Sequence, residues 1–168
     1  SAATGQYLVA WENGGLLGAA WVDPMLMVSY QFFSVNVPGT EPAVACSTSE
    51  CLVAFTQVGA TTDIAGLRFS SPSLSPSTIS IFAAPGPQRS PTVSRTGSTW
   101  VVAWVDDNMV AGTSNIALAK SESLSMAFQP VPVNLPNSSK DQPAIACGGL
   151  GCTLVYRAFG GLQFVEFP

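Results

Sequence analysis

The hydrophobic positions of this chain fall into one short pattern that recurs along its length. Each copy begins with a proline, passes through a short segment and a turn, and reaches an apolar run that ends on an aromatic residue. In three full copies the aromatic residue lies 13 positions after the proline: Pro42 to Phe55, Pro91 to Trp104 and Pro143 to Tyr156. A partial copy runs from Tyr7 to Trp11. Such a repeat indicates an array of equal supersecondary units.

Each copy is expected to contain a set of short β-strands. The proline suits the start of the first strand, because its missing N–H costs nothing there. The apolar run is typical of a second strand that is buried on both faces. Third strands are predicted at 16–22, 64–69, 116–120 and 162–167, and outer strands at 32–35, 79–83 and 128–133.

These strands predict an all-β fold of about three and a half four-stranded β-propeller blades, part of a larger ring. The copies are spaced by 49 and then 52 residues, so the length differences fall in the connecting loops. The repeats are expected at approximately 1–40, 41–89, 90–141 and 142–168 of a single domain, residues 1–168. A β-sandwich is the alternative, but it gives no reason for a fixed 13-residue interval.

Two segments resemble the blade motif of a bacterial family of secreted β-propeller repeat proteins, P-x-V-A … Y-L-V-x-W … D-I-x-G-x-R. They are Tyr7-Leu8-Val9-Ala10-Trp11 and Asp63-Ile64-Ala65-Gly66-Leu67-Arg68. The resemblance covers most of the chain. It implies a propeller in an extracellular setting and assigns no function, because the motif is a folding signature.

The four cysteines occupy equivalent points of two repeats, on either side of the turn between the first and second strands. Residues at the two ends of such an antiparallel hairpin face each other, close enough for a disulfide. The alternative is a four-cysteine zinc site, which would need both pairs to converge. We predict the disulfides Cys46–Cys51 and Cys147–Cys152 and therefore an oxidising compartment.

The remaining full repeat carries Arg95 and Trp100 where the others carry cysteines. A guanidinium that lies over an indole would hold this hairpin with about 0.5–1 kcal/mol. We therefore expect a cation–π contact in place of the disulfide.

Composition narrows the classes of function. Apolar residues make up 47% of the chain and charged residues 10%, which favours a folded protein with a weakly charged surface. Six basic residues against ten acidic ones leave no basic stripe for nucleic acid. No segment has the roughly 20 uninterrupted apolar residues of a membrane span. The sequence has no histidine, which removes the most frequent general base.

The predicted repeats do not close a ring by themselves. An open propeller exposes strand edges and an apolar blade face. We therefore expect another protein chain or a second copy to complete the propeller. A chain that begins at Ser1 also suggests a processed product.

Polar residues in the loops after the second strands are the candidate ligand-binding positions. They are Glu12, Asn13, Asp106, Asp107, Asn108 and Arg157. Their oxygen atoms suit calcium, although such residues more often solvate turns, and no cofactor is required. Glu12, Asp63 and Asp106 are conceivable carboxylates for glycoside hydrolysis, but no spacing requires them to converge.

These features predict a non-catalytic extracellular interaction or scaffold subunit, not an enzyme. Low charge, the apolar excess and the incomplete ring favour this function. The alternative is a glycan-binding propeller lectin, which would place Trp or Tyr beside Asn and Asp in repeated pockets. The repeated aromatic residues lie in apolar runs, so we expect them in the core instead.

Overall fold

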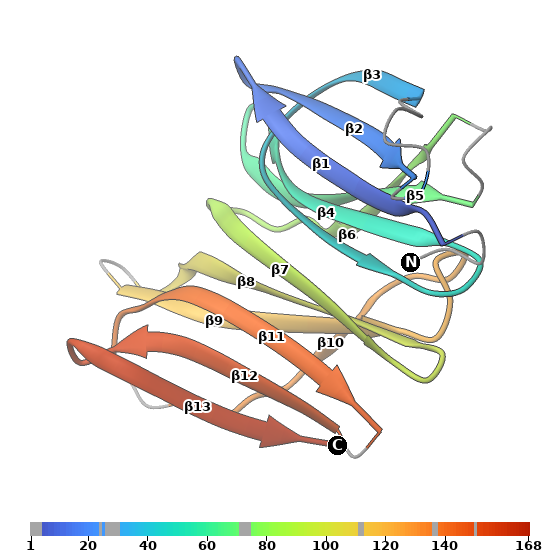
Figure 1. Cartoon of the computed structure of the whole chain (residues 1–168). Coiled ribbons are helices and arrows are strands. Elements are labelled where there is room, and N and C mark those ends of the chain that lie inside the picture. Colours follow the sequence, from blue (N-terminus) through green and yellow to red (C-terminus); the bar gives the residue numbers. More distant parts are fainter. Residues whose placement is uncertain are drawn as a thin grey trace.

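The computed structural model describes residues 5–23, 25, 31–70, 75–110, 113–135, 138–149 and 151–168, with only the backbone given for 31–36 and 108–110. Within these ranges the chain consists of antiparallel β-strands and turns, without a helix (Figure 1). The strands form four successive blades that stack from the top of the view, at β1 and β2, to the bottom, at β13.

The long strand β3 joins the first two blades. Blade I contains β1 (Tyr7–Asn13), β2 (Leu16–Val22) and the first part of β3 (Gln31–Cys46), which pairs with β2. Blade II contains the second part of β3, β4 (Cys51–Val58), β5 (Thr62–Phe69) and β6 (Ser77–Phe82).

The other two blades are separate sheets. Blade III contains β7 (Gln88–Thr96), β8 (Thr99–Val110), β9 (Thr113–Ser121) and β10 (Gln129–Val131). Blade IV contains β11 (Lys140–Gly148), β12 (Gly151–Ala158) and β13 (Gly161–Phe167). The first strands are innermost, because β7 contacts both β3 and β11 (Figure 1). The predicted all-β, partial propeller is therefore confirmed.

The apolar second strands supply the core, since alternate residues face opposite neighbours. In β4, Val53 and Phe55 pack toward blade I, whereas Leu52 and Ala54 pack toward blade III. Trp104 fills the II–III interface and Tyr156 the III–IV interface, and both are almost fully buried. The repeated aromatic residues of these three blades are therefore core residues, as predicted.

The repeated proline lies inside the inner strand and not at its start, which corrects the expected strand boundary. β7 begins at Gln88 and β11 at Lys140, each three residues before its proline. The pairing register shifts at all three prolines, so each occupies a β-bulge. A bulge tolerates proline because the unpaired position needs no ladder hydrogen bond.

At the opposite end of the inner strands, the hairpins that lead into the second strands are cross-linked by the contacts that the sequence predicts. Disulfides join Cys46 to Cys51 and Cys147 to Cys152. In blade III, the Arg95 guanidinium carbon lies 5.5 Å from the centre of the Trp100 ring. The cation–π contact is therefore confirmed.

Hydroxyl side chains of β7 bind the backbone of the next inner strand, β11. The N–H of Cys147 donates to Ser94 Oγ at 2.9 Å, and the N–H of Ile145 donates to Thr92 Oγ1 at 3.4 Å. Thr96 Oγ1 donates to the carbonyl of Gly148 at 2.6 Å. Three alternate residues of β7 thus bind backbone groups at the edge of blade IV.

Candidate functional site

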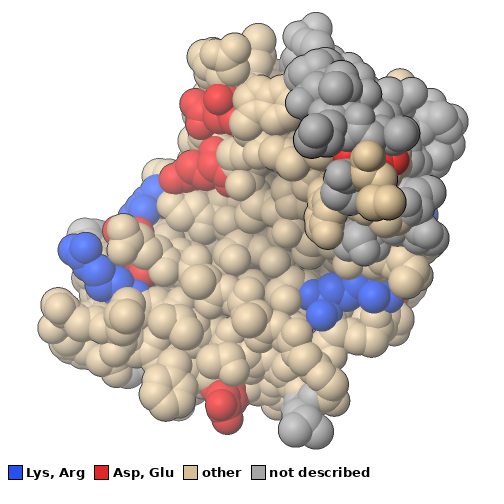
Figure 2. All heavy atoms as spheres, in the orientation of Figure 1, with Lys and Arg blue, Asp and Glu red and all other residues tan. Residues whose placement is uncertain are grey.

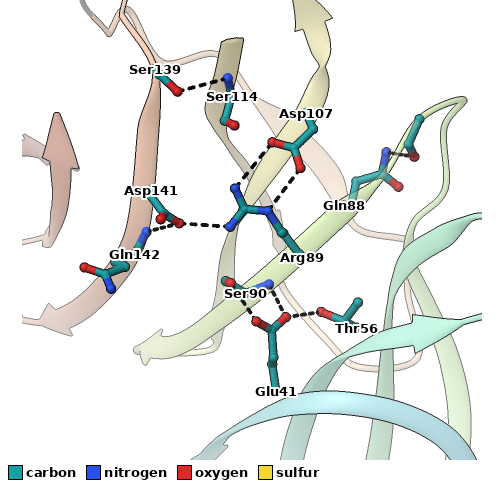
Figure 3. A network of polar contacts seen from close by, with 11 residues as sticks. Glu41, Thr56, Gln88, Arg89, Ser90, Asp107, Ser114, Ser139, Asp141 and Gln142 are labelled. Carbon is teal, nitrogen blue, oxygen red and sulfur yellow. Dashed lines mark hydrogen bonds and ion pairs between the residues drawn. The ribbon is translucent and has the colours of Figure 1, made fainter. Parts of the chain in front are cut away.

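Charged side chains from consecutive blades meet where the inner strands begin (Figure 3). Arg89, near the start of β7, lies at the centre. Its Nε donates to Asp107 Oδ2 at 3.0 Å, and its Nη1 donates to Asp141 Oδ1 at 2.9 Å. Asp107 belongs to β8 and Asp141 to β11, so one guanidinium links blade III to blade IV.

Glu41 makes the corresponding link from blade II to blade III (Figure 3). Its Oε2 accepts the backbone N–H of Ser90 at 2.7 Å and the hydroxyl of Thr56 at 2.9 Å. Its Oε1 accepts the Ser90 hydroxyl at 2.9 Å. These donors satisfy a single carboxylate from two blades.

These contacts favour the ionised forms of Glu41 and Asp141. Burial acts to raise the pKa of Glu41, but the hydrogen bonds from Ser90 and Thr56 outweigh it and lower the pKa. Burial likewise opposes ionisation of Asp141, whereas the hydrogen bonds from Arg89 and Gln142 bring its pKa below the ordinary value. Both groups are therefore ionised at neutral pH.

The residue before each repeated proline has an unusual backbone conformation. Glu41, Ser90 and Gln142 each directly precede a repeated proline, and their φ angles are 55°, 52° and 53°. A non-glycine residue in this left-handed region costs about 1–3 kcal/mol and persists only where its surroundings fix it. The β-bulge thus fixes the orientation of the polar side chain that precedes the proline in each of these three inner strands.

An open pocket of about 460 Å³ lies beside Asp141. Its lining includes Arg157, Lys140 and Phe159. Phe159 is 72% exposed, and its φ of 54° places this aromatic residue in a strained turn between β12 and β13. Arg157 is exposed and makes no ion pair with any residue that the structure describes. The pocket therefore combines an aromatic face with a carboxylate and an exposed guanidinium.

Figure 2 shows acidic and basic side chains next to one another along the left edge of the molecule, the side on which β7 and β11 begin in Figure 1. The middle of this face is largely uncharged. Residues of both charges are therefore neighbours at this end of the blades, while separate charged groups lie toward the right side and at the lower edge of the view.

The structure brings two of the predicted site residues into the polar network or the pocket beside it. Asp107 binds Arg89, and Arg157 lines the pocket. Glu12 and Asn13 are exposed at the end of β1, and Asp106 is buried opposite Gln88. The side chain of Asn108 is outside the described residues.

Of the carboxylates considered for glycoside hydrolysis, Asp63 is bonded to Thr61 in its own loop, and Glu12 and Asp106 are not part of the network drawn in Figure 3. The described residues contain no group of three or more acidic or cysteine side chains arranged to hold a metal. Nor do they include a helix long and apolar enough to cross a membrane.

Sequence reasoning missed Glu41, Arg89 and Asp141. A signal was present, because a charged residue stands one or two positions before each repeated proline. The proline was assigned to a strand start, so the residues before it were treated as loop. Only the bulge shows that they belong to the inner strands.

Comparisons with known proteins identify the fold. Neither a protein-family model nor a curated protein sequence matches the chain. Among solved structures, the catalytic domain of a GH62 α-L-arabinofuranosidase from Coprinopsis cinerea is similar with a TM-score of 0.60 and 8% identity, over 97% of this chain and 68% of that one. A GH43 endo-arabinanase from Bacillus licheniformis is similar with a TM-score of 0.56 and 14% identity, over 99% and 71%.

A third similar structure is an endo-1,4-β-xylanase from Bacteroides thetaiotaomicron, with a TM-score of 0.59 and 7% identity, over 92% of this chain and 62% of that one. The GH43 and GH62 neighbours are five-bladed β-propellers. This chain thus has the fold of part of such a propeller.

This finding corrects the predicted function. The predictions of a non-catalytic scaffold subunit and of no enzyme are wrong, because the similar structures are glycoside hydrolases. The sequence spacing gave no reason to expect carboxylates from different blades to converge, so the enzymatic alternative was set aside. Glycoside hydrolysis needs carboxyl groups and not imidazole, and the inner strands supply carboxylates.

Proposed function

We propose that this chain is part of a glycoside hydrolase that acts on polysaccharides containing arabinose or xylose. The observation that carries the proposal is the convergence of Glu41, Asp107 and Asp141, from three successive blades, at one end of the inner strands. The similar structures support the substrate class, since they include an arabinofuranosidase, an arabinanase and a xylanase.

The carboxylates divide into two roles. Glycosidases place two carboxyl groups about the scissile bond, one of which acts as a base or nucleophile. Asp141 suits that role, because it lies beside the open pocket and Arg89 keeps it charged. Glu41 is a second ionised carboxylate at the same end of the blades and can stabilise positive charge that develops on the sugar, while the proton for the leaving-group oxygen must come from a carboxyl group other than these two. Asp107 is a positioning residue, because both of its carboxylate oxygens accept hydrogen bonds from Arg89, which in turn contacts Asp141.

The pocket provides surfaces that suit a sugar. The exposed ring of Phe159 offers an apolar face against which the C–H groups of a pyranose or furanose ring pack. Arg157 offers hydrogen-bond donors to hydroxyl oxygens. A sugar held there would lie next to Asp141.

We also infer that the protein works outside the cytoplasm. Its two disulfides would persist in an oxidising compartment, and plant-type polysaccharides are encountered outside the cell.

The test is reducing-sugar release from arabinan and arabinoxylan by the purified chain. The substitutions Asp141→Asn and Glu41→Gln are expected to lower the rate by about 10²- to 10⁴-fold, the usual contribution of a positioned acid or base. Glu50→Gln is the matched control, since Glu50 pairs with Arg68 next to the Cys46–Cys51 disulfide. If Asp141→Asn and Glu50→Gln retain the same activity, the proposed site is wrong.

A further inference from the structure

The outer face of blade IV exposes large apolar side chains. On β13, Leu162 is 77% exposed and Phe164 is 71% exposed. They point away from blade III, because the alternate residues Val165 and Phe167 are the ones that pack on the III–IV core. A sheet face of this kind marks a surface that another element covers.

The repeat identifies what normally covers this face. Ala117 on β9 pairs with Trp104, and Gln163 on β13 pairs with the equivalent Tyr156. Leu162 and Phe164 therefore occupy the positions that Ile116 and Leu118 occupy in blade III. Those two residues are each 2% exposed, because blade IV packs over them. The face of blade IV is thus the next interblade surface in the series.

Blade I presents the complementary surface. Val9 on β1 is equivalent to Val53 on β4, which is 1% exposed because blade I covers it, yet Val9 is 46% exposed. Tyr7 on the same side of β1 is 55% exposed. One end of the array therefore offers the face that a following blade covers, and the other end offers the face that a preceding blade covers.

Polar contacts between blades follow the same series. Glu41 of blade II binds Ser90 of blade III, and Arg89 of blade III binds Asp141 of blade IV. Each contact reaches the start of the next inner strand. Arg157 lies at the same end of the open face of blade IV. It is opposite Asp141 in the β11–β12 pair and acts on that carboxylate electrostatically, but it forms no ion pair within the described residues. A carboxylate on a covering blade would complement its exposed guanidinium.

We propose that one further four-stranded blade packs between blade IV and blade I. It is carried by polypeptide outside residues 1–168, has apolar faces on both sides, and bears an acidic residue at the start of its inner strand beside Arg157. A single blade fits because the similar structures are five-bladed, and this chain supplies four blades of such a ring, the first two of which share β3. A second copy of the chain would add four blades and does not fit that ring.

The experiment supplies the missing blade from the chain's own repeat. An extended chain consists of residues 1–167 followed by a second copy of residues 122–168. The copied β10 completes blade IV, and the copied β11, β12 and β13 form the inner three strands of the added blade, with a copy of Asp141 near the start of its inner strand. Phe164→Cys reports on the open face by its rate of reaction with a maleimide. Ser98→Cys, in the exposed turn between β7 and β8, is the matched control.

In the 168-residue chain, thiols at positions 164 and 98 should react at similar rates. In the extended chain, the rate at position 164 should fall by roughly tenfold or more, as expected for a site that must open before it reacts, while the rate at position 98 stays unchanged. Asp141→Lys in the added copy should reverse part of the protection, because it places a cation beside Arg157.

Two further measurements test the proposal if the chain extended with residues 122–168 folds poorly. A second extended chain takes its added blade from residues 39–69, in which Glu41 lies near the start of the inner strand. In the unextended chain, Leu162→Lys with Phe164→Lys should leave the thermal midpoint unchanged. A large loss there would show that the face packs within this chain and would overturn the proposal.

Two other results would also overturn it. One is a folded extended chain in which position 164 reacts as fast as before. The other is a dimer of the 168-residue chain, seen by light scattering, in which position 164 is already protected. These readouts are structural, so they do not depend on whether the chain hydrolyses glycans.

Discussion

Two leucines in the third strands provide a matched test of how the blades are held together. Leu118 on β9 is 2% exposed and packs against blade IV, whereas Leu162 on β13 is 77% exposed. The substitution of alanine removes the same atoms at both sites. The free energies of unfolding of the two variants therefore compare a covered blade face with an open one.

The magnitude follows from burial. Leu118→Ala should lower the free energy of unfolding by about 2–5 kcal/mol, because it removes buried methyl groups and leaves a cavity between two sheets. Leu162→Ala should change it by about 0.5 kcal/mol or less, as exposed substitutions do. For a chain of this size each kcal/mol lowers the thermal midpoint by roughly 2–4 °C.

Urea titration followed by tryptophan fluorescence measures both variants, and calorimetry gives their thermal midpoints. The linear dependence of the free energy on urea should have the same slope for the two proteins, so that the midpoints compare stability directly. The interpretation of the blade faces is refuted if Leu162→Ala costs as much as Leu118→Ala. It is also refuted if Leu118→Ala costs less than about 1 kcal/mol, far below the range for a buried leucine.

Three other features lead to measurable predictions. Stability should fall as the pH drops below about 4–5, because Glu41 and Asp141 have folded pKa values below their unfolded ones, so their contribution is present above the unfolded pKa and is lost on protonation; thermal midpoints measured from pH 7 to pH 3 should show a shallower decline in a Glu41→Gln, Asp141→Asn double variant. Ser94→Ala should cost about 1 kcal/mol in urea titration, because it leaves the N–H of Cys147 without its acceptor, and an unchanged midpoint would contradict this role. Gly39→Ala should cost about 1–3 kcal/mol, since a Cβ there would lie 2.5 Å from the Phe55 ring; a stable variant with unchanged near-UV circular dichroism would show that the ring moves aside freely.

The repeat made most of the fold predictable from the sequence. The 13-residue interval from Pro42 to Phe55 spans a bulge, an inner strand, a turn and half of a second strand, and each of these parts has a local sequence requirement. The cysteine pairs were predictable for the same reason, because Cys46 and Cys51 are separated by a single turn. Local signals fix local structure.

The candidate site was less predictable because it depends on packing between blades. Arg89 and Asp141 are 52 positions apart in the sequence, and only the contact between β7 and β11 brings them within 2.9 Å. The left-handed conformation at Glu41 is also invisible in the sequence, because glutamate rarely adopts it. Of the predicted candidates, Asp107 reached the network and Glu12 did not, since loops with similar composition end at different points of the fold.

At each bulge, the side chain that precedes the proline is independent of the apolar core between the blades. The same backbone conformation carries Glu41, Ser90 and Gln142, three side chains that differ in charge and in hydrogen-bonding capacity. None of them contributes to the apolar clusters between the sheets. The side chain at each of these positions can therefore be exchanged without repacking the interior of the protein.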